Sequence, residues 1–256
     1  MHFRCNGAVL AGTLNLPNET GRHPAVIYVH ASGEASRWTW EVPWVRKIVS
    51  SGLAFFSYDK RGVGESEGVC CPCDDNHFNL LAAAVVGAVN ALRSRNEIDA
   101  AQIGLLGLSQ GGWIVPLATV RSNDQIAFTA IVSGAATTTH EEEQWSELAG
   151  EEDDNPPELT KQAKAEITEQ LDPAGFDPVP LIQRLSVPGL WLYGGQDRSV
   201  PTDQSAETIR RLSQAAHKDF SVVMFENAGH GLLDTPPTDP RAITTLVKWL
   251  REHVRT

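Results

Sequence analysis

Apolar and polar positions define two kinds of segment that alternate along most of the chain. Short continuous apolar runs bounded by glycine, proline or polar residues indicate strands buried on both faces, as in a parallel sheet. Residues 2–16 alternate loosely and predict an N-terminal β-hairpin. The other predicted strands are 25–30, 53–58, 103–108, 126–133, 190–194 and 220–226, and the predicted helices are 42–51, 75–95, 111–120, 202–217 and 240–254. Such alternation is typical of a doubly wound α/β sheet.

One segment, residues 137–180, interrupts the alternation. It contains no strand candidate, and it holds 13 aspartates and glutamates against two lysines. The rest of the chain is balanced, so this segment carries the whole formal charge of −11. It is too long for a plain loop. We therefore expect a core domain made of 1–136 and 181–256, with 137–180 inserted as an acidic helical lid or cap.

Composition narrows the class of protein further. The 256 residues suit one α/β domain, with 41% hydrophobic and 21% charged residues. The mean hydropathy is −0.22, and no apolar run approaches the ~20 residues that span a bilayer, so we expect no membrane partner. The acidic balance argues against nucleic acid, which requires a basic face. The N-terminus lacks a signal-peptide pattern, so we expect a cytoplasmic protein. We expect a monomer or a homodimer.

The strongest local signal is Gly-Leu-Ser-Gln-Gly-Gly at 107–112, which fits G-x-S-x-G. It directly follows a predicted strand and begins a predicted helix, so Ser109 would occupy a sharp strand-to-helix turn. Glycines two residues before and after the serine remove Cβ atoms that would clash there. We interpret Ser109 as a nucleophile and the Gln110 N–H, at the helix start, as an oxyanion donor. The competing interpretation is a tight turn with an incidental serine.

A serine hydroxyl needs a base to become a good nucleophile. Of the eight histidines, His230 lies between two glycines directly after the last predicted strand, as in a tight loop that presents one imidazole. Asp197 follows the strand at 190–194 and is the candidate carboxylate that orients this imidazole; an ordinary turn aspartate is the alternative. The chain order Ser109, Asp197, His230 is that of the α/β-hydrolases and differs from that of chymotrypsin or subtilisin.

Four short sequence blocks, in the order in which they occur along the chain, resemble those of α/β-hydrolase-fold serine hydrolases, especially bacterial esterase-like members. Besides G-x-S-x-G they are YDKRGVGES at 58–66, WLYGGQDRSVP at 191–201 and NAGHG at 227–231. The match covers nearly the whole chain outside the lid. It implies the α/β-hydrolase fold, a doubly wound and mostly parallel sheet with a helical lid insertion, and a triad that requires neither cofactor nor metal. The resemblance is weak for the substrate, because this fold supports many chemistries.

The resemblance also assigns roles around the nucleophile. His-Ala-Ser-Gly at 30–33 resembles the HG-x-G oxyanion loop, so we expect the Ser32 N–H to join that of Gln110 in the oxyanion hole. Ala31 stands where relatives usually have glycine, and it is the alternative donor. Asp59 and Arg61 are expected to fix the turn in which they lie.

Two further groups of residues are open to more than one interpretation. Cys70, Cys71 and Cys73 with His77 could hold zinc or form a redox disulfide, although loop or packing cysteines are the plainer interpretation. Trp38 and Trp145 could line an acyl pocket, as ligand pockets are largely apolar, with helix packing as the alternative. An acidic lid over the site would disfavour anionic substrates.

The function predicted from these residues is cleavage of a small-molecule carboxylic ester through an acyl-enzyme. A peptidase or amidase, or a thioesterase or lactonase, could use the same triad. Peptidases of this type usually add a large N-terminal β-domain, for which 256 residues leave no room. A small-molecule receptor or pseudoenzyme is the alternative from another class, and an intact triad argues against it.

Overall fold

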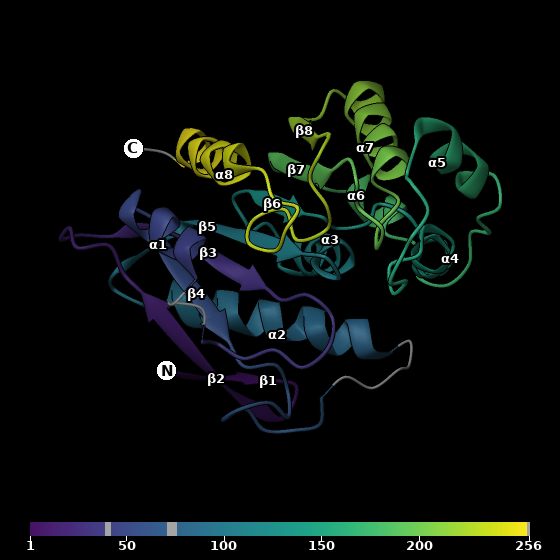
Figure 1. Ribbon diagram of the computed structural model, residues 1–256. Helices are drawn as coiled ribbons and strands as arrows, with labels where there is room; N and C mark the ends of the chain where they lie inside the picture. Colours follow the sequence, from purple (N-terminus) through teal and green to yellow (C-terminus); the bar gives the residue numbers. More distant parts are fainter. Residues whose placement is uncertain (39–41, 71–75, 255–256) are drawn as a thin grey trace.

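The structure is a computed structural model that describes residues 1–38, 42–70 and 76–254. Within these residues eight strands form one sheet in the order β1-β2-β4-β3-β5-β6-β7-β8 (Figure 1). The strands are β1 His2–Cys5, β2 Ala8–Asn15, β3 His23–Val29, β4 Ala54–Tyr58, β5 Ile98–Leu108, β6 Thr129–Val132, β7 Gly189–Gly194 and β8 Phe220–Phe225. The helices are α1 Pro43–Ser50, α2 Asn76–Arg93, α3 Gly111–Arg121, α4 Thr139–Ala149, α5 Lys161–Thr168, α6 Val179–Ile182, α7 Thr202–Ala216 and α8 Pro240–His253.

The sheet is antiparallel at one edge and parallel through the rest. Strand β2 pairs antiparallel with both β1 and β4, whereas β4, β3, β5, β6, β7 and β8 pair in parallel. Asn6 and Gly7 join β1 to β2 with φ angles of 40° and 76°. Two successive positive φ angles suit a tight hairpin turn, and Asn-Gly adopts them readily. The predicted hairpin and the mostly parallel sheet are both present.

Helices cover both faces of the sheet, which explains the continuous apolar runs of its strands. On one face, α2, α3 and α7 pack on Ile27, Phe56 and Leu105. On the other face, α1 and α8 pack on Val26, Phe55 and Leu106. Both faces of each central strand are therefore buried, and functional residues are expected in the loops at the strand ends.

Two strands begin three or more residues away from their predicted starts, while the other strands within the parallel sheet differ by one or two residues. Strand β5 begins at Ile98 rather than 103, because its first residues form a half-exposed, partly polar extension whose only pair with β3 is His23 with Ile98 before a bulge. Strand β6 begins at Thr129 rather than 126. In both cases pairing with a neighbouring strand, and not the apolar run, sets the boundary.

The segment 137–180 contains α4, α5 and the start of α6. A capping box begins α4: the Thr138 hydroxyl accepts from the Glu141 N–H, and the Glu141 carboxylate accepts from the Thr138 N–H. Trp145, Ala149, Leu159 and Ile167 form a small apolar cluster that joins α4 to α5. Among the described residues, no helix is long and apolar enough to cross a membrane.

Candidate active site

Ser109 lies in the turn between β5 and α3 with a φ of 49°. A positive φ is unfavourable for a residue with a side chain, so this conformation persists only where the surroundings enforce it. A Cβ atom on Gly107 would lie 2.7 Å from Val115 Cγ2, and one on Gly111 would lie 3.2 Å from the Val29 carbonyl oxygen. A side chain at Gly107 would therefore force its surroundings to shift, and one at Gly111 would press on the Val29 backbone. Glycine at both positions suits a serine on a sharp turn, as the sequence predicted.

His230 and Asp197 are directly hydrogen-bonded. Nδ1 of His230 lies 2.9 Å from Oδ2 and 3.1 Å from Oδ1 of Asp197. Asp197 is 1% exposed, and its Oδ1 also accepts from the backbone N–H groups of Ser199 and Val200 at 2.9 Å. These bonds hold the carboxylate still in the loop after β7. The arrangement leaves Nε2 of His230 free to work as a base.

The charges around His230 favour its protonated form. Burial, the largest single influence, lowers the pKa of the imidazole, but the hydrogen bond and charge of Asp197 together with the charges of Glu151 and Glu142 outweigh it. The net effect is a pKa above the usual value. Glu142 and Glu151 come from the inserted segment, so the insert contributes to the electrostatics of the imidazole. Sequence patterns contained no signal for this role.

Ser109 and His230 line the same cavity, which has a volume of about 170 Å³. It lies at the carboxyl ends of the parallel strands, where open α/β sheets bind ligands. Its wall is completed by Ala31, Leu108, Val132, Ser133, Gly231, Leu232, Leu233 and Asp234. A larger cavity of about 1250 Å³ lies between the ends of α1 and α8, and no triad residue lines it.

Ser133, which the sequence analysis did not single out, supports the histidine loop. It follows β6 with a φ of 50°, and its hydroxyl donates to the His230 carbonyl oxygen over 2.7 Å. The backbone strain is thus matched by a bond that positions the base. Its place as the last residue of a predicted strand is the one signal that could have identified it.

The two expected oxyanion donors are Gln110 and Ser32, of which Gln110 directly follows Ser109 in the chain. Gln110 is the residue before the first turn of α3. Of the loop 30–33, Ala31 lines the cavity and Ser32 does not. The assignment of the second donor to Ser32 or Ala31 therefore stays a prediction.

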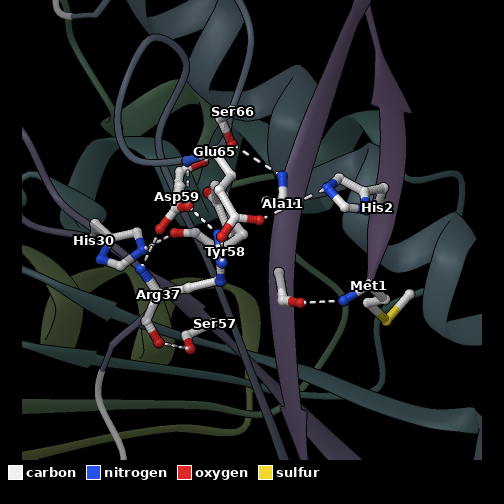
Figure 2. A network of polar contacts seen from close by, with 11 residues as sticks. Met1, His2, Ala11, His30, Arg37, Ser57, Tyr58, Asp59, Glu65 and Ser66 are labelled. Carbon is white, nitrogen blue, oxygen red and sulfur yellow. Dashed lines mark hydrogen bonds and ion pairs between the residues drawn. The ribbon is translucent and has the colours of Figure 1, made fainter.

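Asp59 organises the turn after β4, although its partner is not Arg61 (Figure 2). Its buried carboxylate pairs with the Arg37 guanidinium and accepts from the Arg37 and Glu65 N–H groups at 2.7 and 3.0 Å. Arg61 instead donates to the Cys5 carbonyl oxygen over 3.1 Å and ties the turn to the first hairpin. Both residues fix the turn, but through separate contacts.

Trp38 and Trp145 are absent from the lining of the Ser109 cavity. Trp38 is 69% exposed and packs beneath the Arg37 guanidinium. Trp145 is 2% exposed, and its Nε1 donates to the Asp197 carbonyl oxygen over 3.3 Å. The expectation that these rings line an acyl pocket is not supported by their positions; for Trp145 the packing alternative describes what is observed.

The cysteine cluster is only partly visible. Cys70 is disulfide-bonded. A disulfide-bonded Cys70 cannot serve as the thiolate ligand that the zinc hypothesis assigned to it, and Cys71 and Cys73 lie outside the described residues. Among the residues that the structure describes, no group of three or more His, Cys, Asp or Glu side chains is arranged to hold a metal ion.

A model of the prolyl oligopeptidase family matches residues 82–256, which include Ser109, Asp197 and His230. The chain belongs to this family. The resemblance to α/β-hydrolase-fold serine hydrolases and the predicted fold are thereby confirmed. As a member of the prolyl oligopeptidase family, the chain carries the three candidate residues in the part that the family model covers.

Individual relatives are distant or align over short stretches. Esterase EstD of Thermotoga maritima is 22% identical, with 94% of this chain and 65% of that protein aligned. A Salmonella typhimurium protein is 43% identical over 53 residues, so the chain spans only 19% of its length. The esterase Pf2001 of Pyrococcus furiosus superposes with a TM-score of 0.72 at 15% identity, covering 98% of this chain and 89% of that one. At this identity the likeness shows the fold alone.

Proposed function

We propose that this member of the prolyl oligopeptidase family is a serine esterase. The observation that carries the proposal is the strained Ser109 sharing one cavity with His230, whose Nδ1 is held by the buried Asp197. A nucleophile, a base and an orienting carboxylate in this arrangement perform acyl transfer on unrelated folds.

In the proposed reaction Ser109 Oγ attacks the ester carbonyl while His230 Nε2 takes its proton. Asp197 fixes the tautomer of the imidazole and stabilises the imidazolium that forms. Backbone N–H groups of Gln110 and Ser32 bind the oxyanion of the tetrahedral intermediate. His230 returns the proton to the departing alcohol, and then activates the water that releases the acyl group.

Two of the similar proteins favour an ester as the substrate. A relative aligned over 94% of the chain is named an esterase, and so is the Pyrococcus furiosus neighbour in fold. The cavity of about 170 Å³, with Leu108, Val132 and Leu232 in its wall, fits a short apolar acyl group. We therefore propose short-chain esters as the substrate class.

A peptidase is the second candidate, because the family is named for an oligopeptidase and the rice acylamino-acid-releasing enzyme 1 is 24% identical over 66% of this chain. The same triad would cleave an amide with the amine as leaving group. Clear turnover of an ester with none of the matching anilide distinguishes the two functions.

The test is hydrolysis of p-nitrophenyl esters from acetate to palmitate by the wild type and Ser109→Ala. The proposal predicts activity that is highest on the shortest chains and absent from the variant. Long-chain preference would contradict the small acyl pocket. No activity on any ester would overturn the esterase proposal and favour an amide, thioester or lactone, or a binding role.

A further inference from the structure

Lys60, a residue to which the reaction above gives no role, lies buried beside both predicted oxyanion segments. It is 3% exposed. Its ammonium donates to the carbonyl oxygens of Ala31 at 2.5 Å and Gly33 at 2.9 Å. The same nitrogen lies 3.3 Å from Oε1 of Gln110. One cation thus connects the loop after β3 to the residue that follows the nucleophile.

Among the described residues, Lys60 has hydrogen-bond partners but no carboxylate in ion-pair contact. Asp59, its neighbour in sequence, is paired with Arg37. No ion pair joins Lys60 to a carboxylate anywhere in 1–38, 42–70 or 76–254. His30, which also faces it, has its pKa lowered to about 4 by burial and is neutral. A buried ammonium without a carboxylate partner is costly, and burial lowers the pKa of Lys60 to about 8. The two loop carbonyls and Gln110 are the groups that offset this cost.

Peptide geometry links the lysine to the oxyanion hole. The carbonyl of Ala31 and the N–H of Ser32 belong to one planar trans peptide group, so they point in opposite directions. Holding the carbonyl on the ammonium therefore fixes the direction of the Ser32 N–H, away from Lys60. A cation on the carbonyl also polarises the peptide and strengthens its N–H as a donor.

We propose that Lys60 is a positioning residue that presents the Ala31–Ser32 peptide to the oxyanion and joins it to Gln110. The inference deepens the proposed esterase function and rests on it. Lys60 does not line the Ser109 cavity. It acts through the N–H of Ser32.

The test replaces Lys60 with methionine, which keeps most of the side-chain volume and removes the charge and the donors. The matched control is Lys218→Met, because Lys218 Nζ also donates to a backbone carbonyl, that of Leu185 at 2.6 Å, on a surface remote from Ser109. The measurements are kcat and KM on p-nitrophenyl acetate and the Kd of phenylboronic acid, whose tetrahedral serine adduct places an oxygen in the oxyanion hole.

The inference predicts that kcat of Lys60→Met falls about 10- to 100-fold, less than the loss from deleting a donor outright. KM should change less than about threefold, boronate affinity should weaken in parallel with kcat, and Lys218→Met should match the wild type. If Lys60→Met fails to fold, we measure Lys60→Gln, which keeps a neutral donor. Its kcat and its boronate affinity are also expected to fall.

Three results would overturn the inference: kcat of the folded Lys60 variants within twofold of the wild type, a loss confined to KM, or an equal loss in Lys218→Met. An active wild type combined with a fully active Lys60→Met rejects this inference alone. A wild type without activity on any ester rejects the proposed function and this inference with it.

Discussion

Nε1 of Trp145 donates a hydrogen bond of 3.3 Å to the backbone carbonyl oxygen of Asp197. This bond joins the inserted segment 137–180 to the loop that carries the triad carboxylate. Arg198 adds a second connection, because its guanidinium donates to the carbonyl oxygens of Ala149 and, over 2.7 Å, Pro157. The inserted segment therefore packs against the loop that carries Asp197 and restrains that loop without contributing a triad residue.

Replacing Trp145 with phenylalanine should therefore affect the site as well as the fold. The variant keeps a buried ring and loses the donor to Asp197, so we expect a loss of about 1 kcal/mol in the free energy of unfolding. We also expect a severalfold fall in kcat, because the acid loop becomes less fixed. Urea unfolding and ester kinetics measure both. Trp249→Phe on α8 is the control, and an equal fall in its kcat would refute the connection.

Asp197→Asn should reduce kcat by about 10³- to 10⁴-fold with little change in KM, because the imidazole loses its orientation and its counter-charge. The same substitution removes the largest contributions that raise the pKa of His230, so that pKa falls. The acid limb of the pH–rate profile should move to lower pH. A variant with more than a tenth of wild-type kcat would show that Asp197 is not the orienting acid.

Glu142 and Glu151 raise the pKa of His230 by their charge, and the base must be neutral to work. Activity should thus rise with pH as His230 loses its proton. Removing the charge with Glu142→Gln disfavours the imidazolium, so the acid limb should shift to lower pH. The pKa of Glu142 is itself raised to about 7, by burial and by the charge of Glu151, so its effect on His230 grows through neutral pH.

The pH dependence of kcat/KM for Glu142→Gln tests this assignment against Glu147→Gln, an exposed substitution on the same helix. Only the first variant should move the acid limb. Identical profiles for the wild type and Glu142→Gln would mean that the inserted segment does not tune the base.

Arg37→Met should destabilise the protein by about 3–5 kcal/mol, because it leaves the buried Asp59 carboxylate without its cation. The exposed pair of Arg241 and Asp239 provides the control, and Arg241→Met should have little effect, since solvent screens it. Equilibrium denaturation compares the two variants. Similar midpoints for both would contradict the structural role given to Asp59.

Most of the fold could be predicted because its strands are buried on both faces and stand out as apolar runs. The site could be predicted where short-range geometry dictates the residue type. Gly107 has no room for a side chain beside Val115, Gly111 has little room beside Val29, and His230 lies in a loop bounded by glycines. Such constraints act between neighbours in sequence and therefore leave a motif.

The remaining contacts join residues that are distant in sequence and leave no motif. Asp59 pairs with Arg37, although Arg61 is closer to it in sequence. Lys60 donates a hydrogen bond to Ala31, in the loop after β3. The Trp145 indole donates to the Asp197 carbonyl oxygen and does not line the Ser109 cavity. The burial and orientation of this ring depend on how the insert packs against the core. These pairings follow from tertiary structure, which apolar periodicity does not specify.

The central claim is that Ser109 carries the acyl group. Rapid acid quenching of the wild type with p-nitrophenyl acetate, followed by peptide mass spectrometry, tests it most directly. The account predicts an acetyl group on the peptide that contains Ser109, located on that residue and absent from Ser109→Ala. Ester turnover that persists in Ser109→Ala, or an acetyl group found on another residue during turnover, would contradict it.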